Sequence, residues 1–153
     1  MSSNVVDDPR VHPHIGRFYR RKYAAMGRYL PHGGIMDRQG NANRFARHLK
    51  RGGVVVIVSD LPPDPHEKPL WRPFLGCTRG FAPGPMKLAE IAGADVMAFV
   101  CVHKNGEHVL TFSAPGQEPY AFLAQQIAAA PPLWWAADLL PLLPLSPQEM
   151  AHA

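Results

Sequence analysis

The chain has 153 residues and a mass of 16.9 kDa, which fits one ordinary domain of ~100–150 residues. Hydrophobic residues make up 46% and charged residues 18%, which excludes a disordered acidic or basic tail. The formal net charge of +4 is unevenly spread: residues 1–53 hold eleven Lys/Arg and three Asp/Glu, whereas residues 54–153 hold five and nine. Fourteen of the seventeen prolines lie at or after Pro62. A basic first third is therefore followed by an apolar, proline-rich remainder.

The first third predicts two helices with basic outer faces. Val11 to Tyr29 has apolar residues at helical spacing and opens at Pro13. Asn41 is a candidate cap for a second helix that runs to Arg51, where Gly52-Gly53 ends it. Ile35-Met36 predicts a short strand between them. The outer face of the first helix carries Arg17, Arg20, Arg21, Lys22 and Arg28.

The remainder predicts strands that alternate with helices. Val54 to Val58 consists of five consecutive β-branched residues, which is typical of a strand buried on both faces, as in a parallel sheet. Leu61 to Thr78 is a proline-rich connection, long enough to be functional or lid-like. Strands are also expected over Asp95–His103 and His108–Phe112, joined at Asn105-Gly106.

Helices are predicted over Pro83–Ala92 and Glu118–Ala130. Together with the strands they indicate the α/β class, with a mostly parallel sheet flanked by helices.

Several kinds of segment and site are not expected. Met1 to Pro9 lacks the apolar core of a signal peptide, and no run of ~18 apolar residues exists. Cys77 and Cys101 have no metal-binding spacing, so we expect a reducing compartment, no metal and no cofactor. Nucleic acid is not an expected partner, because no Gly-rich phosphate loop, aromatic RNA-binding pattern or zinc-finger spacing occurs.

Two polar positions are candidates for a binding site. Asp60 follows the predicted strand at its carboxyl end, where functional residues gather in α/β sheets, but it could instead cap the turn before Pro62. Arg38, beside Asp37, could bind phosphate or carboxylate, or the two could form a solvated pair.

The basic helix face and the histidines give further candidates. Arg17, Arg20 and Arg21 could meet anionic lipid head groups or an acidic carrier protein, or form a solvated face. Among eight histidines, His32 with Asp37 formally fits H-x-x-x-x-D, in which a histidine deprotonates a hydroxyl and an acid orients its ring. The intervening Gly33-Gly34 and the lack of an apolar strand before them favour a chance match.

Five stretches, in chain order, resemble segments of one bacterial family, and their order and spacing hold from about Val5 to about Trp135. Ile35–Arg38 is similar to its "mlDR" segment, and Leu49–Asp60 to its strand with a following Asp. Pro83–Ala94 is similar to its "T-G-…-L-A-…-s-G-A" helix. The other two stretches are Trp71–Gly76 and Ala130–Trp135. The family is the lipid A biosynthesis acyltransferases, which comprise the lauroyl and myristoyl transferases.

The chain also departs from the family pattern. The catalytic H-x-x-x-x-D/E of the family lies upstream of the segment that Asn4–Pro9 resembles, so the resemblance implies that this chain begins past the catalytic histidine. Asp37 corresponds to the aspartate of "mlDR", so His32 and Asp37 do not replace that motif. Ala136–Asp138 stands where the family has a basic "h-r-r".

The resemblance implies an incomplete glycerolipid-acyltransferase-like fold over residues 1–145, with residues 146–153 as a tail. It implies acyl transfer from an acyl carrier protein or acyl-coenzyme A to a lipid or glycolipid hydroxyl, in a truncated or split form that a separate N-terminal half could complete. Arg38 would contact phosphate or the acyl donor, Asp60 would order the site, and Pro73, Phe74, Leu75 and Gly76 would shape an acyl groove. The protein would lie peripherally on the cytoplasmic face of the inner membrane. The alternative is a non-catalytic acyl- or carrier-protein-binding module or assembly subunit.

Overall fold

The computed structural model describes residues 12–30, 33–35, 41–134 and 136–151. It divides the chain into two compact units, Met1–Val55 and Val56–Ala153, called here the first and second units. No helix among the described residues is both long and apolar enough to cross a bilayer.

The described residues of the first unit form the helices α2 (Pro13–Gly27) and α3 (Ala42–Lys50), close to the predicted ranges. The ring Nδ1 of His12 accepts a hydrogen bond from the His14 backbone N–H at 3.3 Å and so caps α2, with Pro13 at the first helical position. Gly52, at φ +80°, follows α3 in a left-handed conformation that suits glycine. Both helix predictions are confirmed.

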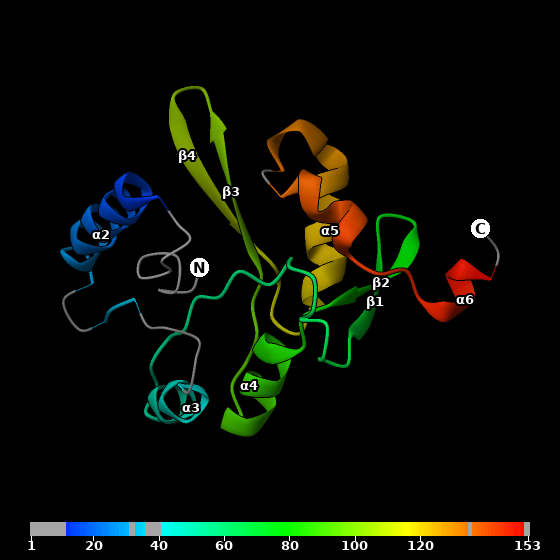
Figure 1. The fold of residues 1–153 in the computed structure, drawn as a ribbon, viewed down its shortest axis with the longest axis horizontal. Helices are drawn as coiled ribbons and strands as arrows, with labels where there is room; N and C mark the ends of the chain where they lie inside the picture. The colour runs from blue at the N-terminus through cyan, green and yellow to red at the C-terminus, as the bar shows by residue number, and fades with distance from the viewer. Residues whose placement is uncertain (1–11, 31–32, 36–40, 135, 152–153) are drawn as a thin grey trace. The chain divides into compact units, whose positions relative to one another are not determined.

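The second unit contains two antiparallel hairpins (Figure 1). The first hairpin pairs β1 (Leu70–Phe74) with β2 (Cys77–Phe81), and Leu75 and Gly76 form its turn with φ of 51° and 85°. The second pairs β3 (Phe99–Lys104) with β4 (Glu107–Phe112). Its turn is the predicted Asn105-Gly106, again with both residues at positive φ, as a two-residue hairpin turn requires.

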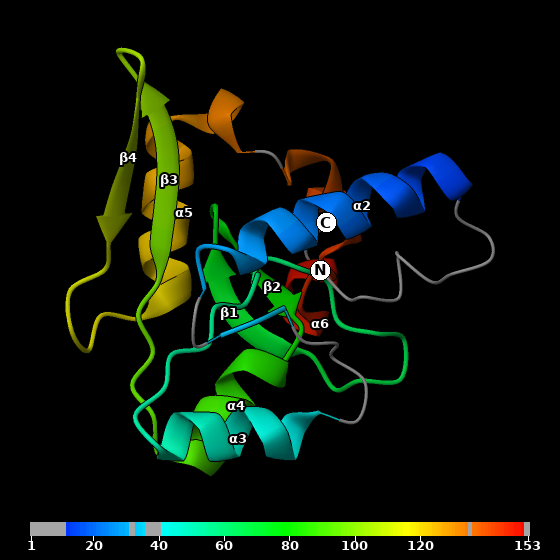
Figure 2. The ribbon, with the colours of Figure 1, turned by 90° about the vertical axis from the view of Figure 1, so that its left-hand side faces the viewer.

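Three helices of the second unit accompany these hairpins. They are α4 (Gly84–Ala92), which ends at Gly93 with φ +62°, α5 (Pro119–Ala129), and the short α6 (Pro147–Met150). Two 3₁₀ helices, Pro131–Leu133 and Ala137–Leu142, connect α5 to α6. In Figures 1 and 2, α5 lies alongside β3, whereas β4 forms the outer edge of its hairpin.

The core of the second unit lies over the β1–β2 hairpin. Phe74, Phe81 and Tyr120 are each at most 1% exposed, and Leu143 covers them from the C-terminal segment. The Phe74 and Phe81 rings meet edge to face at 5.0 Å, and Phe81 lies 4.4 Å from Tyr120, distances at which aromatic pairs attract. The β1–β2 hairpin and the C-terminal segment after α5, residues 130–134 and 136–151, called here the strap, are far apart in sequence and share one core.

Backbone and side-chain hydrogen bonds fasten this strap to β2. Arg79 Nη1 donates to the carbonyl oxygens of Leu140 and Leu143, both at 3.0 Å. The Ser146 N–H donates to the Thr78 carbonyl at 3.0 Å, and the Thr78 N–H donates to Glu149 Oε1 at 2.9 Å. Residues of the predicted tail therefore bond directly to the hairpin.

The mixed α/β class is confirmed, but the mostly parallel sheet is wrong, because both described sheets are two-stranded and antiparallel. Val54 to Val58 does not form the predicted buried strand. Val54 is 81% exposed and Val56 71% exposed, and no described strand pairs with them. A β-branched run favours extended backbone, yet it becomes a strand only where a neighbour satisfies its backbone hydrogen bonds.

Candidate functional site

Asp60 is held by an indole from the other end of the second unit. Trp134 Nε1 donates a hydrogen bond to Asp60 Oδ2 at 2.8 Å, and both residues are partly buried. The Trp134 ring also meets Phe74 edge to face at 5.9 Å. The structure thus brings together residues from three of the five stretches on which the family resemblance rests.

A second polar group joins β1 to the start of α5. Arg72 Nε lies 3.2 Å from Glu118 Oε1, and the other carboxylate oxygen of Glu118 caps α5 by accepting from the Ala121 N–H at 2.7 Å. Arg72 Nη1 donates to the Trp71 carbonyl at 2.8 Å. Because two backbone groups and an ion pair fix these side chains, the guanidinium has a defined position at the end of α5.

Tyr120 places a phenol beneath this ion pair. Its side chain is 1% exposed, and its hydroxyl has no hydrogen-bond partner among the described residues. Burial raises the pKa of Tyr120 to about 12, and the negative charge of Glu118 adds to the rise while Arg72 opposes it. The phenol is therefore neutral at physiological pH and does not act as a base.

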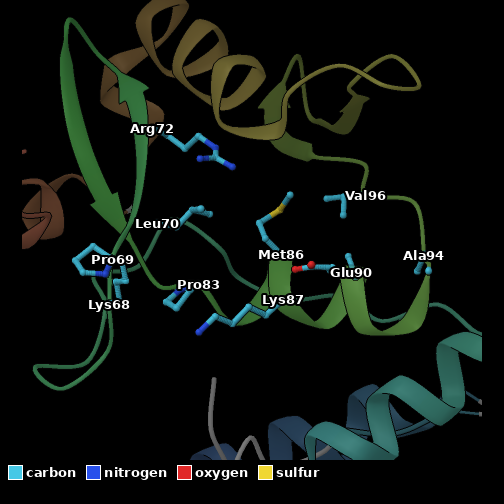
Figure 3. A pocket seen from close by; sticks show the side chains of 12 residues that line it. Lys68, Pro69, Leu70, Arg72, Pro83, Met86, Lys87, Glu90, Ala94 and Val96 are labelled. Atoms are coloured by element: carbon cyan, nitrogen blue, oxygen red, sulfur yellow. The ribbon is translucent and has the colours of Figure 1, made fainter.

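A cavity of about 630 Å³ lies between β1, the residues before it, and α4, within the second unit. In Figure 3 the side chains of Leu70, Met86 and Val96 point toward this space. Three cationic side chains and one carboxylate also line it: Lys68, Arg72, Lys87 and Glu90. The combination of an apolar interior with an excess of positive charge suits an anion that carries a hydrocarbon chain.

The predicted acyl-groove residues lie at the tip of the first hairpin. Pro73 and Phe74 end β1, and Leu75 and Gly76 form the turn. None of the four lines the cavity, and Phe74 is 1% exposed within the core. Their role in shaping an acyl groove stays a prediction.

His32, Asp37 and Arg38 lie outside the described residues, so their predicted roles stay predictions. Within the described part of the chain, no histidine forms a hydrogen bond or ion pair with a carboxylate. His14 instead lies 3.4 Å from Arg17 Nη2, and the rings of His103 and His108 meet at 5.3 Å. No described group of three or more His, Cys, Asp or Glu could hold a metal ion.

The three predicted basic residues are brought to one exposed helix. Arg17, Arg20 and Arg21 all lie on α2 and are exposed. The helix also exposes apolar side chains: Ile15 is 47% exposed and Phe18 60% exposed. The described surface of α2 therefore presents both positive charge and apolar side chains.

Comparisons with protein-family models, curated proteins and solved structures found no match to this chain.

Sequence reasoning did not find several residues that the structure places around the cavity and the core. Lys68 and Lys87 have no motif of their own, because each is an isolated lysine. Glu118 has a readable signal, since an acidic residue directly before Pro119 is a typical helix start. The pairing of Trp134 with Asp60 spans 74 positions and has no local signal.

Proposed function

We propose that this chain takes part in acyl transfer of the lipid A biosynthesis type, from an acyl carrier protein or acyl-coenzyme A to a lipid or glycolipid hydroxyl. Its role is to bind the acyl donor. No described residue has the role of general base in this proposal, and His32 stays the candidate that the sequence offers. Reaction at the surface of the inner membrane, on its cytoplasmic side, is part of the same proposal.

The observation that carries the proposal is the hydrogen bond between Asp60 and Trp134. The family resemblance singled out Asp60 and the stretch that ends at Trp135 independently of any structure. Their side chains meet at 2.8 Å, beside Phe74 of a third such stretch. An ordered carboxylate at this place supports the role of Asp60 in organising the site.

The surface of α2 supports the membrane part of the proposal. Arginines on an amphipathic helix are attracted to anionic head groups, at about 1 kcal/mol for each charge near the surface. The exposed Ile15 and Phe18 would enter the boundary between head groups and acyl chains. The acceptor in such a reaction is a lipid, so a helix on the membrane brings the chain to its substrate.

A second candidate is a non-catalytic module that binds an acyl chain or an acyl carrier protein. The observation that favours it is the cavity of about 630 Å³ between β1 and α4, which is lined by apolar side chains and by Lys68 and Lys87. A hydroxyl nucleophile needs a base within hydrogen-bond reach, and general-base assistance contributes ~10²–10⁴-fold to the rate. Both candidate functions require binding of the acyl donor, and only the acyl-transfer function also requires turnover.

The experiment measures donor binding and turnover separately. Purified chain is titrated with acyl carrier protein that bears a dodecanoyl group and, in parallel, with the same carrier lacking the acyl group. We expect tighter binding of the acylated form, weakened by Asp60→Ala and unchanged by Asp138→Ala, an exposed acid that serves as the matched control. Equal binding of both carriers, or binding of neither, overturns the proposal.

Turnover is then followed with radiolabelled acyl carrier protein and a hydroxylated lipid acceptor in vesicles. Product formed only when a histidine-bearing N-terminal half is added supports the catalytic role. Binding without product under both conditions favours the non-catalytic module. Product formed by this chain alone and lost in His32→Ala would assign the base to His32.

A further inference from the structure

We propose that the cavity between β1 and α4 binds a ligand that carries both a long aliphatic chain, such as that of a fatty acyl group, and a phosphate group. This rests on the proposed function for the choice of an acyl ligand, and it names the place where that ligand binds. The phosphate would lie against Lys68 and Lys87, and the hydrocarbon chain would extend over Leu70, Met86 and Val96.

The size of the cavity suits such a ligand. Pockets for small molecules commonly enclose ~300–1,000 Å³, and this one has about 630 Å³. A single dodecyl chain with a phosphate is a small-molecule ligand of the size that such pockets hold. Apolar side chains from both β1 and α4 supply the walls (Figure 3).

The charged side chains that line the cavity favour a ligand with a negatively charged head group. Glu118 balances the charge of Arg72, so the two lysines against Glu90 leave a net charge of +1 around the cavity. Lys68 and Lys87 are exposed and form no ion pair or hydrogen bond with any described residue through their side chains. Their ammonium groups are therefore available to an incoming anion.

Arg72 and Glu90 have different roles in this arrangement. Arg72 already bonds to Glu118 and to the Trp71 carbonyl, so it is held in place at the cavity before any ligand arrives. Glu90 is an exposed carboxylate in the lining, and its charge opposes the binding of an anion. The lining thus predicts opposite effects from removing a lysine and from removing the glutamate.

Dodecyl phosphate is the probe that carries the shared chemistry, an aliphatic chain and a phosphate, with no carrier attached. Its affinity for the full chain is measured by calorimetry below its micelle concentration. Lys87→Met should weaken binding about 3- to 5-fold, and the double variant with Lys68→Met about 10-fold, as expected for exposed charge pairs. Glu90→Gln should strengthen binding about 2- to 3-fold. Lys104→Met, at the β3–β4 turn, is the matched control and should change nothing.

Further probes measure separately how much the phosphate and the aliphatic chain contribute to binding. Inorganic phosphate should bind at least 100-fold more weakly than dodecyl phosphate, because it lacks the aliphatic chain. Met86→Ser should reduce this difference in affinity, because it weakens the binding of the chain only. Dodecanoyl-coenzyme A and a lysophospholipid with a phosphate head group are compared as the two sources of this chemistry. The compound that displaces dodecyl phosphate from the wild type, and displaces it less well from Lys87→Met, is identified as the ligand.

Two results overturn the inference: binding of dodecyl phosphate that Lys87→Met and Glu90→Gln leave unchanged, or no binding at all. Circular dichroism of each variant shows whether it folds, so a folded variant with unaltered binding is decisive. Failure here is distinguishable from failure of the proposed function. If acylated carrier protein binds while these variants have no effect, the donor binds elsewhere and only the cavity assignment is wrong.

Discussion

The two hairpins of the second unit have the same architecture, but the side chains of the first are far more buried than those of the second, which are largely exposed. Each is two-stranded and antiparallel, with a two-residue turn at positive φ. Phe74 and Phe81 of the first hairpin are at most 1% exposed, whereas Phe99 and Phe112 of the second are 41% and 53% exposed. The difference arises because Leu143 of the C-terminal strap and Tyr120 and Ile127 of α5 pack in one core with the first hairpin, whereas no residue of the second hairpin belongs to that core cluster. Burial in this chain is determined by what packs on a strand pair and not by the strand pair itself.

The largest expected effect comes from removing one aromatic ring from each hairpin. Phe81→Ala should lower the free energy of unfolding by about 3–5 kcal/mol, because it leaves a cavity between Phe74 and Tyr120. Phe112→Ala should lower it by about 1 kcal/mol or less, because half of that side chain is already in water. Urea denaturation followed by tryptophan fluorescence measures both. Equal losses would contradict the contrast between a covered and an uncovered hairpin.

A pH titration tests the same covered core. The pKa of Tyr120 is raised to about 12 in the folded chain, whereas an unfolded tyrosine titrates near ~10. The unfolded chain therefore loses its proton first, and stability should fall as the pH rises from ~10 toward 12, by up to about 2 kcal/mol. Below pH ~10 this contribution is constant.

The measurement is the urea midpoint between pH 9 and 11.5 for the wild type and for Tyr120→Phe. The variant should lose the part of the pH dependence that belongs to Tyr120. Tyr29→Phe is the control, because that side chain is 86% exposed and should behave as wild type. A pH dependence that is the same in all three chains would show that the phenol is not buried in solution.

How much of this contrast follows from the sequence can be judged from particular residues. The helices α4 and α5 and the Asn105-Gly106 turn are predictable, because caps, prolines and glycines act within a few positions. The strand over Val54–Val58 was a wrong prediction, since periodicity cannot say whether a neighbouring strand is present. The connection predicted over Leu61–Thr78 was wrong in part, because β1 lies within it. The covering of β2 by Leu143 was not predictable either, because it depends on Arg79 bonding to carbonyls more than 60 positions away.

Of the candidate-site residues, too, some were predictable from the sequence and others were not. Asp60 was identified from its position after an apolar run, but its partner Trp134 comes from a contact across the fold. Lys68 and Lys87 became candidates only when β1 and α4 placed them around one cavity. Local patterns therefore located single residues, and tertiary packing decided which of them act together.

A smaller effect is expected from the hydrogen bond between Trp134 and Asp60, which attaches the strap to the segment before β1. Asp60→Ala and Trp134→Phe, measured singly and together, form a double-mutant cycle. We expect a coupling of about 1.5–3 kcal/mol, as for a hydrogen bond to a charged acceptor that is partly shielded from water. Chemical denaturation gives the four free energies. Additive losses would mean that this hydrogen bond does not fasten the strap.

The smallest expected effect concerns the link between the first hairpin and α5. The cycle of Arg72→Met with Glu118→Gln should give a coupling of about 0.5–1 kcal/mol, because both side chains are about one-third exposed or more. Raising the salt concentration from 0.05 M to 1 M should reduce it further, by screening. A coupling that is larger and independent of salt would place this ion pair in a drier environment than its exposure indicates.

The central claim, that the acyl ligand binds beside the covered hairpin, is tested most directly by photolabelling. A dodecanoyl-coenzyme A whose chain carries a diazirine is irradiated with the full chain, and the labelled peptides are identified by mass spectrometry. We predict labels at Leu70, Met86 or Val96, which are removed by excess dodecanoyl-coenzyme A and reduced in Lys87→Met. Labels confined to the exposed face of the second hairpin, at Phe99, Leu110 or Phe112, would contradict the account.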